Sequence, residues 1–200
     1  MYILVVIVKE TNVEILNGNI KTMTIKIKEL ESGCMPQILD NGEWIDLVLA
    51  EDLRFKAPQA CKLHRRNQKN KDVAEERTRD VDFHSHIAKM GIAAQIPQGY
   101  EVNIVPRSST FKKYGLLQTN HFGVIDSSYC GEDDEWGMPV VATRAVIIPK
   151  GTRLAQFRVN LSQKATVWQK LKWLFSSGVK LKKVNSLNNP NRNGFGSTGN

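Results

Sequence analysis

The sequence has few of the features that mark secreted, membrane and repeat proteins. Its 200 residues include three cysteines, Cys34, Cys61 and Cys130, and this odd, unpaired set predicts neither a disulfide framework nor a zinc site with paired ligands. No apolar run approaches the roughly 18 residues that a membrane helix needs. No internal repeat is visible, and the apolar opening MYILVVIVK lacks a preceding basic segment and a cleavage site, so we interpret it as a strand. We therefore expect one soluble domain in the reducing cytoplasm.

Positive charge is in excess. The chain has 28 Lys and Arg against 20 Asp and Glu, a formal net charge of +8, which favours anionic partners such as nucleotides. Residues 57–80 are rich in charge and poor in large apolar groups, and between Lys62 and Arg79 there are seven basic and three acidic residues. We predict that residues 57–80 form an insertion outside the core, where a regulatory protein partner is one alternative to a plain surface loop.

Short segments with alternating apolar residues dominate the rest of the chain and predict a mostly-β fold. The candidate strands are residues 24–28, 44–48, 100–106, 145–149 and 179–184. Glycine-containing turns separate them at spacings typical of barrels and sandwiches rather than of βαβ units. One short helix is predicted over residues 166–175. The acidic run at 132–135 is interpreted as a solvated loop.

Two segments carry the residues best suited to bind a nucleotide. Arg107, Ser108 and Ser109 follow a predicted strand, and a guanidinium beside two hydroxyls suits phosphate oxygens; the alternative is a serine helix cap with a surface arginine. A second predicted strand delivers Asp126 into a turn, with Tyr129 three residues later. A carboxylate here can orient and deprotonate a water, although Asp before two serines is also an ordinary turn former.

Two weaker segments extend this set. Residues 151–157 form a glycine turn that leads into a strand bearing Arg153 and Gln156. The chain ends in NRNGFGSTGN, where composition alone predicts a disordered terminus, although Arg192 and Phe195 are present among small residues.

Taken in order, PRSS at 106–109, GVIDSSYCG at 123–131, GTRLAQ at 151–156 and GFGSTG at 194–199 resemble motifs two to five of the trimeric dUTPases of phage or bacterial type. The first motif is similar to WIDL at 44–47, which makes Asp46 its carboxylate; DVDF at 80–83 is the alternative.

The resemblance covers roughly residues 24–199 and implies a dUTPase-like β-barrel subunit, jelly-roll-like, with one short helix and a flexible C-terminal arm. It divides the chain into an N-terminal extension (1–22), a β domain (23–187) and the active-site arm (188–200), with Met23 as a candidate second start.

The resemblance also implies the activity, which is hydrolysis of dUTP to dUMP and pyrophosphate. Asp126 would activate water at the α-phosphorus, and Tyr129 would pack under the deoxyribose. Mg²⁺ on the triphosphate would be held through water by Asp46 and Gln156, and the active sites would be shared between the chains of a homotrimer. The substrate contacts implied are Arg107, Ser108, Ser109, Asn120, Gly123, Val124, Ile125, Tyr129, Arg153, Gln156, Arg192, Phe195, Gly196, Ser197 and Thr198.

Within the arm, the resemblance implies that Phe195 stacks on uracil while Arg192 and residues 196–198 bind the phosphates. Arg192 stands three residues before Phe195, a closer spacing than in many family members. The arm is therefore expected to be mobile in the empty enzyme and to close over the bound nucleotide.

Two rival functions remain. A dCTP deaminase has a related fold, but Lys112 stands where that family carries an arginine, and Asp126 is followed by two serines rather than by ProGly. The other rival is a regulatory binding protein that uses this fold as a scaffold. Neither a membrane nor a specific nucleic acid is an expected partner.

Overall fold

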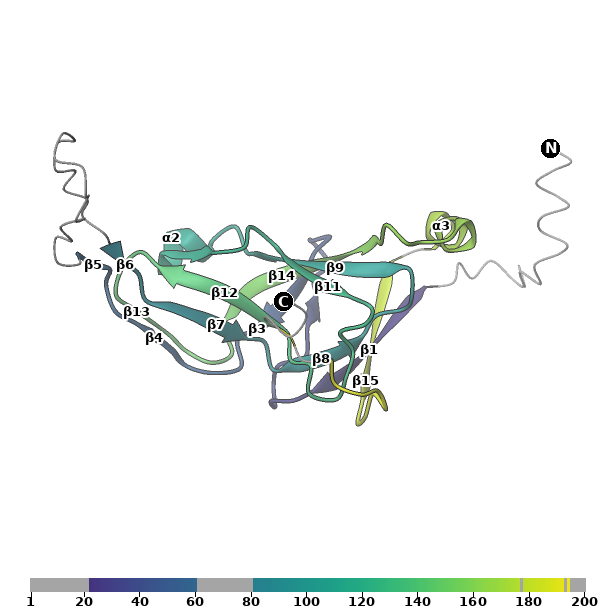
Figure 1. Cartoon of the computed structure of the whole chain (residues 1–200), viewed down its shortest axis with the longest axis horizontal. Helices are drawn as coiled ribbons and strands as arrows, with labels where there is room; N and C mark the ends of the chain where they lie inside the picture. The colour runs from purple at the N-terminus through teal and green to yellow at the C-terminus, as the bar shows by residue number, and fades with distance from the viewer. Residues whose placement is uncertain (1–21, 61–80, 177, 193, 195–200) are drawn as a thin grey trace, which may run out of the picture.

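A computed structural model of the chain describes residues 22–60, 81–176, 178–192 and 194, and strands dominate them. The strands are β1 (Met23–Glu29), β2 (Gln37–Ile38), β3 (Ile45–Val48), β4 (Leu53–Phe55), β5 (Gln59–Ala60), β6 (Val81–Asp82), β7 (Ser85–Lys89), β8 (Ile92–Gln95), β9 (Tyr100–Pro106), β10 (Leu116–Gln118), β11 (Gly123–Asp126), β12 (Gly137–Ala142), β13 (Val146–Ile148), β14 (Arg153–Leu161) and β15 (Val179–Val184). The predicted mostly-β class is confirmed (Figure 1).

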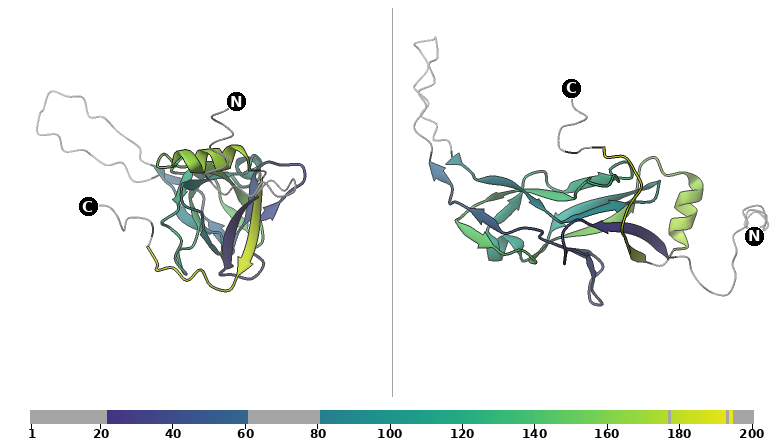
Figure 2. Two further views of the ribbon diagram at one scale, coloured as in Figure 1. Left: turned by 90° about the vertical axis from the view of Figure 1, so that its right-hand side faces the viewer. Right: turned by 90° about the horizontal axis from the view of Figure 1, so that it is seen from below.

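The largest sheet has five antiparallel strands in the order β11-β9-β14-β3-β2. Two three-stranded sheets, β15-β1-β8 and β10-β12-β7, and the pairs β13-β4 and β5-β6 complete the body. Strands β7, β9 and β12 run along its long axis in Figure 1, whereas β15 runs across it, as the end-on view in Figure 2 also shows. Alternate residues of β9 are buried, namely Tyr100, Val102 and Ile104, as the period of two requires for a strand with one face on the core. The sheets therefore face one another across a shared apolar core, in a jelly-roll-like arrangement.

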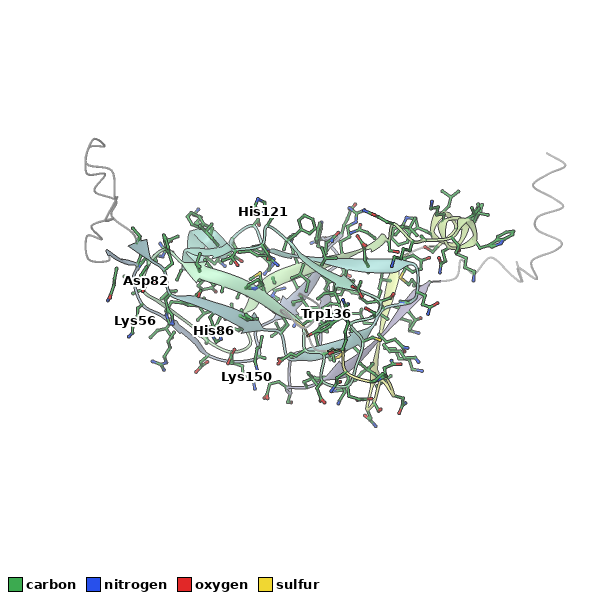
Figure 3. All side chains as sticks on the ribbon, in the orientation of Figure 1. Lys56, Asp82, His86, His121, Trp136 and Lys150 are labelled. Carbon is green, nitrogen blue, oxygen red and sulfur yellow. The ribbon has the colours of Figure 1, made fainter. Side chains whose placement is uncertain are left out.

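The centre of this core is aromatic. Trp136 and Phe157 are both fully buried, and their rings meet edge to face with centroids 5.2 Å apart. Figure 3 shows Trp136 within the body of the molecule, whereas His121 lies at its edge. Phe157 comes from β14, so this contact fixes the five-stranded sheet against the segment that leads into β12.

The structure has two helices in its described part, whereas the sequence predicted one. Helix α3 (Val167–Leu174) falls within the predicted range and begins with a capping box between Thr166 and Gln169. Helix α2 (Thr110–Tyr114) follows β9, and Gly115 ends it with a left-handed φ of 67°. Five residues are too few to produce a helical repeat of apolar residues, so the pattern that revealed α3 was absent for α2.

The ends of the predicted insertion lie side by side. Strands β5 and β6 pair antiparallel, with Gln59 opposite Asp82, so the chain leaves and rejoins the body at neighbouring positions. Residues 61–80, and the strand predicted at residues 1–9, lie outside the described residues. The domain boundaries and a partner role for the insertion therefore stay predictions. In the part of the chain described, neither helix has the length and apolar character needed to cross a membrane.

Candidate active site

Two arginines converge on one buried carboxylate. Asp46, on β3, is 2% exposed, and its Oδ1 lies 3.1 Å from Nε of Arg107 while its Oδ2 accepts a hydrogen bond of 3.2 Å from Nη1 of Arg153. Strand β14 pairs with both β3 and β9, so the start of β14 meets the end of β9 beside Asp46. The carboxylate fixes two partly exposed guanidinium groups side by side, and the cluster retains a net positive charge that suits an anion.

The alternative first-motif segment, DVDF at 80–83, lies apart from this cluster. Asp82 is exposed on β6, and Figure 3 shows it at one end of the molecule. In the described part of the chain, Asp82 forms no ion pair with Arg107 or Arg153, both of which pair with Asp46.

We expect Asp46→Asn to lower the free energy of unfolding by about 2 kcal/mol, because it leaves two adjacent guanidinium groups without their carboxylate. Urea denaturation measures this change. Asp40→Asn is the matched control, since Asp40 is exposed and should change the stability little. Equal stabilities of the two variants would show that the Asp46 cluster contributes nothing to the fold.

The turn after β9 is held against β14 by the chain's own hydrogen bonds. The Arg107 N–H and the Thr110 hydroxyl both donate to the Leu154 carbonyl, at 3.2 and 2.7 Å. Ser109 stands at the N-cap of α2, but its side chain makes no capping hydrogen bond. The chain thus turns from β9 into α2 here, and the Ser109 hydroxyl is not consumed by capping.

Asp126 lies at the end of β11, in a turn that its own side chain shapes. The Ser128 N–H donates to Oδ1 of Asp126 at 2.8 Å, the Ser128 hydroxyl donates to the same oxygen, and the Tyr129 N–H donates to the Asp126 carbonyl at 3.1 Å. Burial alone would raise the pKa of Asp126, but hydrogen bonds from Ser128 and Arg192 outweigh it and lower this pKa below its usual range. The carboxylate is therefore ionised at neutral pH, as a base requires.

Tyr129 is anchored with its ring half-buried. Its hydroxyl donates to the Glu135 carbonyl at 2.9 Å, and burial raises its pKa, so it stays neutral. A Cβ placed on Gly194 would lie 3.0 Å from the Tyr129 hydroxyl oxygen. The C-terminal arm therefore passes directly against this tyrosine.

The segment from Asn120 to Ile125 presents free backbone at a sheet edge. Among the described strands, β11 is the outermost of the five-stranded sheet and pairs with β9 alone. Its other edge offers backbone N–H and C=O groups for a flat, hydrogen-bonding ligand. Asn120 accepts a 2.9 Å hydrogen bond from Gln118, while Gly123 is buried and Val124 is exposed.

Arg192 binds the candidate base. Its Nη1 donates to both carboxylate oxygens of Asp126, at 2.8 and 2.7 Å, and lies 2.6 Å from the Ser128 hydroxyl oxygen. In this structure, Arg192 therefore neutralises Asp126. The other arm residues predicted to bind nucleotide, Phe195 and residues 196–198, lie outside the described residues.

The structure brings the predicted residues together as two clusters rather than one. Asp126 is opposite Glu101 in the β11–β9 register, whereas Arg107 follows the last residue of β9, six residues further along. At about 3.3 Å per residue, these two positions are separated by about 20 Å. We call Asp126, Ser128, Tyr129 and Arg192 the Asp126 cluster, and Asp46, Arg107 and Arg153 the Asp46 cluster. The two clusters therefore lie toward opposite ends of β9.

The acidic loop 132–135 was predicted to be solvated, and for Asp134 this is wrong. Asp134 is 1% exposed and accepts hydrogen bonds from the backbone N–H of Arg192. Because these two residues are 58 positions apart in the chain, no local pattern could have revealed the contact. Ser128 was also missed, although its position two residues after Asp126 is a known turn spacing.

The mostly-β fold, with an arginine pair and an ionised carboxylate at its largest sheet, defines a class of β protein whose surface suits an anionic ligand. A family model described as dUTPase matches residues 72–172. The SPbeta prophage-derived deoxyuridine 5'-triphosphate nucleotidohydrolase YosS of Bacillus subtilis is 37% identical over 178 residues, which cover 88% of this chain and 99% of YosS. The chain belongs to the dUTPase family.

Other known proteins agree with this assignment. The deoxyuridine 5'-triphosphate nucleotidohydrolase of Hydrogenobaculum is 34% identical over 123 residues, 58% of this chain and 72% of that protein. Among solved structures, the dUTPase from phage phi11 of S. aureus superposes with a TM-score of 0.51 at 16% identity, covering 72% of this chain and 93% of that one. The dUTPase of Streptococcus mutans gives 0.51 at 18% identity, covering 68% and 91%. These two structures show the shared fold.

Proposed function

We propose that this protein is a dUTP diphosphatase that hydrolyses dUTP to dUMP and pyrophosphate. The observation that carries the proposal is Asp126, an ionised carboxylate fixed in a turn directly after the free edge of β11. This places a base beside backbone groups able to bind a pyrimidine. Family membership supports the same reaction.

Asp126 has one oxygen suited to a water. Oδ1 accepts from the Ser128 N–H, the Ser128 hydroxyl and Arg192, whereas among the described residues Oδ2 accepts one hydrogen bond, from Arg192. A carboxylate oxygen has two lone pairs, so Oδ2 retains one for a water. The water oxygen bonds to the α-phosphorus, its proton passes to Asp126, and the bond from that phosphorus to the bridging oxygen of pyrophosphate breaks.

The uracil and the deoxyribose of dUTP bind at the Asp126 cluster. Backbone groups of residues 120–125, on the free edge of β11, bind the uracil edge, and the side chain of Asn120 adds an amide. Tyr129 packs under the deoxyribose, where an additional 2′-hydroxyl would be crowded. Phe195, by family resemblance, stacks on uracil from the arm.

The phosphates are bound by the Asp46 cluster. Arg107 and Arg153 supply paired donors whose orientation Asp46 fixes, and the hydroxyls of Ser108 and Ser109 add to them. Fixed donors of this kind stabilise charge that develops on the leaving pyrophosphate. By family resemblance, Arg192 and residues 196–198 add contacts from the arm.

The chain's residues fit Mg²⁺ only as an ion bound to the triphosphate. Asp46 already accepts from two arginines, and the described residues contain no group of three or more His, Cys, Asp and Glu arranged around a common point. Gln156 faces Asp46 across the β14–β3 register, so both can hold the ion's water ligands. The ion would neutralise phosphate charge, and it usually binds through one or two carboxylates plus substrate phosphates.

The distance between the clusters supports a site shared between chains. The α-phosphorus must reach both Asp126 and the arginine donors, yet in one chain these are about 20 Å apart along β9. The exposed side chains of Leu117, Phe122 and Val124, close to the free edge of β11, offer apolar surface for a neighbouring copy. We therefore propose a homotrimer in which each site joins clusters from different chains.

The free thiols of Cys34 and Cys130 and a soluble nucleotide substrate are consistent with a cytoplasmic location, which we propose.

A panel of dUTP, dTTP, dCTP and UTP with Mg²⁺ tests the activity. We expect pyrophosphate release from dUTP with a kcat/KM about 10²-fold or more above each of the others. The base edge of dCTP would leave the site's hydrogen-bonding groups unpaired, dTTP adds a methyl group to the base, and UTP adds a 2′-hydroxyl against Tyr129. Ammonia is measured in parallel with dCTP. Equal rates with UTP would contradict the role of Tyr129, and ammonia release would identify a deaminase instead.

A further inference from the structure

The acidic loop, residues 132–135, contacts the beginning of the C-terminal arm at consecutive points. Glu132 Oε1 accepts hydrogen bonds of 2.5 Å from both the Ser186 hydroxyl and the Asn188 N–H, and its Oε2 lies 2.9 Å from Nζ of Lys28. Hydrogen bonds from Ser186 and Lys28 lower the pKa of Glu132 to about 2. Glu132 therefore ties the chain after β15 to both the loop and β1.

Asp133, the next residue of the loop, exchanges two hydrogen bonds with Asn191 of the arm. The Asp133 N–H donates to Oδ1 of Asn191 at 2.8 Å, and Nδ2 of Asn191 donates to the Asp133 carboxylate at 3.0 Å. Both groups of the Asn191 amide are thus used by one residue of the loop. Such a pair fixes the register between the loop and the arm.

Asp134 joins the arm to the turn that carries Asp126. Its buried carboxylate accepts the Gly131 N–H at 2.8 Å and the Arg192 N–H at 3.0 and 3.1 Å. A Cβ placed on Gly131 would lie 2.4 Å from Cα of Asn191 and 2.6 Å from the Pro190 carbonyl oxygen. The arm backbone therefore lies directly against Gly131, where there is no room for a side chain.

We propose that residues 132–134 form a clasp that docks residues 186–192, the end of the β domain and the start of the arm, before nucleotide binds. Asp134 is the positioning residue for Arg192. The clasp fixes the Arg192 backbone, and the side chain then reaches Asp126. The effect on catalysis rests on the proposed function, whereas the docking does not. Arg192 is thus held at the candidate base in the empty enzyme, which differs from an arm that is mobile until nucleotide arrives.

Gly131→Ala tests the docking without any substrate. We expect hydrogen exchange at the backbone amides of Asn188 and Arg192 to become at least about tenfold faster, because the added Cβ displaces the arm and breaks their hydrogen bonds. Gly42→Ala is the matched control, since the nearest atom to its Cβ would be 3.9 Å away. The rate of dUTP hydrolysis by a chain truncated after Leu187 gives the baseline for an enzyme without an arm.

Asp134→Asn tests the positioning role. It keeps the size of the side chain but weakens the bonds to Arg192, so we expect kcat/KM for dUTP to fall about tenfold or more. Because Arg192 helps to lower the pKa of Asp126 in the empty enzyme, the acid limb of the pH profile of kcat/KM should also move to higher pH. A merely structural role would reduce the amount of folded enzyme without moving this limb.

The outcomes separate the clasp from the activity. Unchanged exchange at both amides in Gly131→Ala, or exchange in the wild type as fast as in an unstructured chain, would overturn the clasp even if dUTP is hydrolysed. Faster exchange in Gly131→Ala supports the clasp even if the wild type fails to hydrolyse dUTP. An acid limb that does not move in Asp134→Asn would overturn the positioning role.

Discussion

Asp126→Asn is expected to lower kcat/KM for dUTP by about 10³-fold, the range in which a positioned general base contributes. The amide retains the shape of the carboxylate, but it cannot take a proton from water at neutral pH. It also loses the charge that binds Arg192, so the guanidinium is no longer held at this position. The loss should therefore appear mainly in kcat, while KM changes less.

Pyrophosphate release measures this loss, and circular dichroism and light scattering verify that the variant is folded and assembled. Asp82→Asn is the matched control, because Asp82 is an exposed aspartate on β6 outside both clusters. If Asp126→Asn releases pyrophosphate at the wild-type rate, the mechanism proposed above is wrong.

Mixed oligomers of two inactive variants are expected to recover activity. Arg107→Ala removes a phosphate donor from one cluster, and Asp126→Asn removes the base from the other. If each site takes its clusters from different chains, a trimer that contains both variants has both residues intact at about one site in three. Coexpression of the two chains with different tags, followed by tandem purification, isolates the mixed oligomers.

The recovered activity should be about a third of the wild-type rate per site, far above that of either variant alone. A coexpressed pair of Asp126→Asn chains with the same two tags is the control and should stay inactive. Mixed oligomers that remain as inactive as this control would show that each site is formed within one chain. That result would require the separation of about 20 Å along β9 to close by a change of structure.

Some elements were predictable because their signals are local. The strands at 100–106 and 179–184 have the predicted bounds, since alternation with a period of two is visible in a short window. The turn that holds Asp126 was predicted from the strand GVID and the serines after it, and the structure places both as expected. The helix over 167–174 also lies within its predicted range.

Other elements depend on residues that are distant in the chain. Asp46 was identified through its resemblance to a family motif, but its two arginine partners follow from the pairing of β14 with both β3 and β9. The short helix α2 was missed because a single turn has no repeat. The separation of the two clusters is visible only in the register of β11 on β9.

By itself, the sequence determined the mostly-β class, the order of the motifs and the residue types that suit phosphate, base and water, because these depend on side-chain chemistry and on short periodicities. The tertiary structure alone decided which of these residues meet. It placed Arg192 on Asp126 across 66 positions of sequence and on Asp134 of the acidic loop across 58, and it placed Arg107 at the far end of β9. Those contacts are set by the register of paired strands and by the packing of segments that are distant in the sequence. Neither is encoded within any one segment.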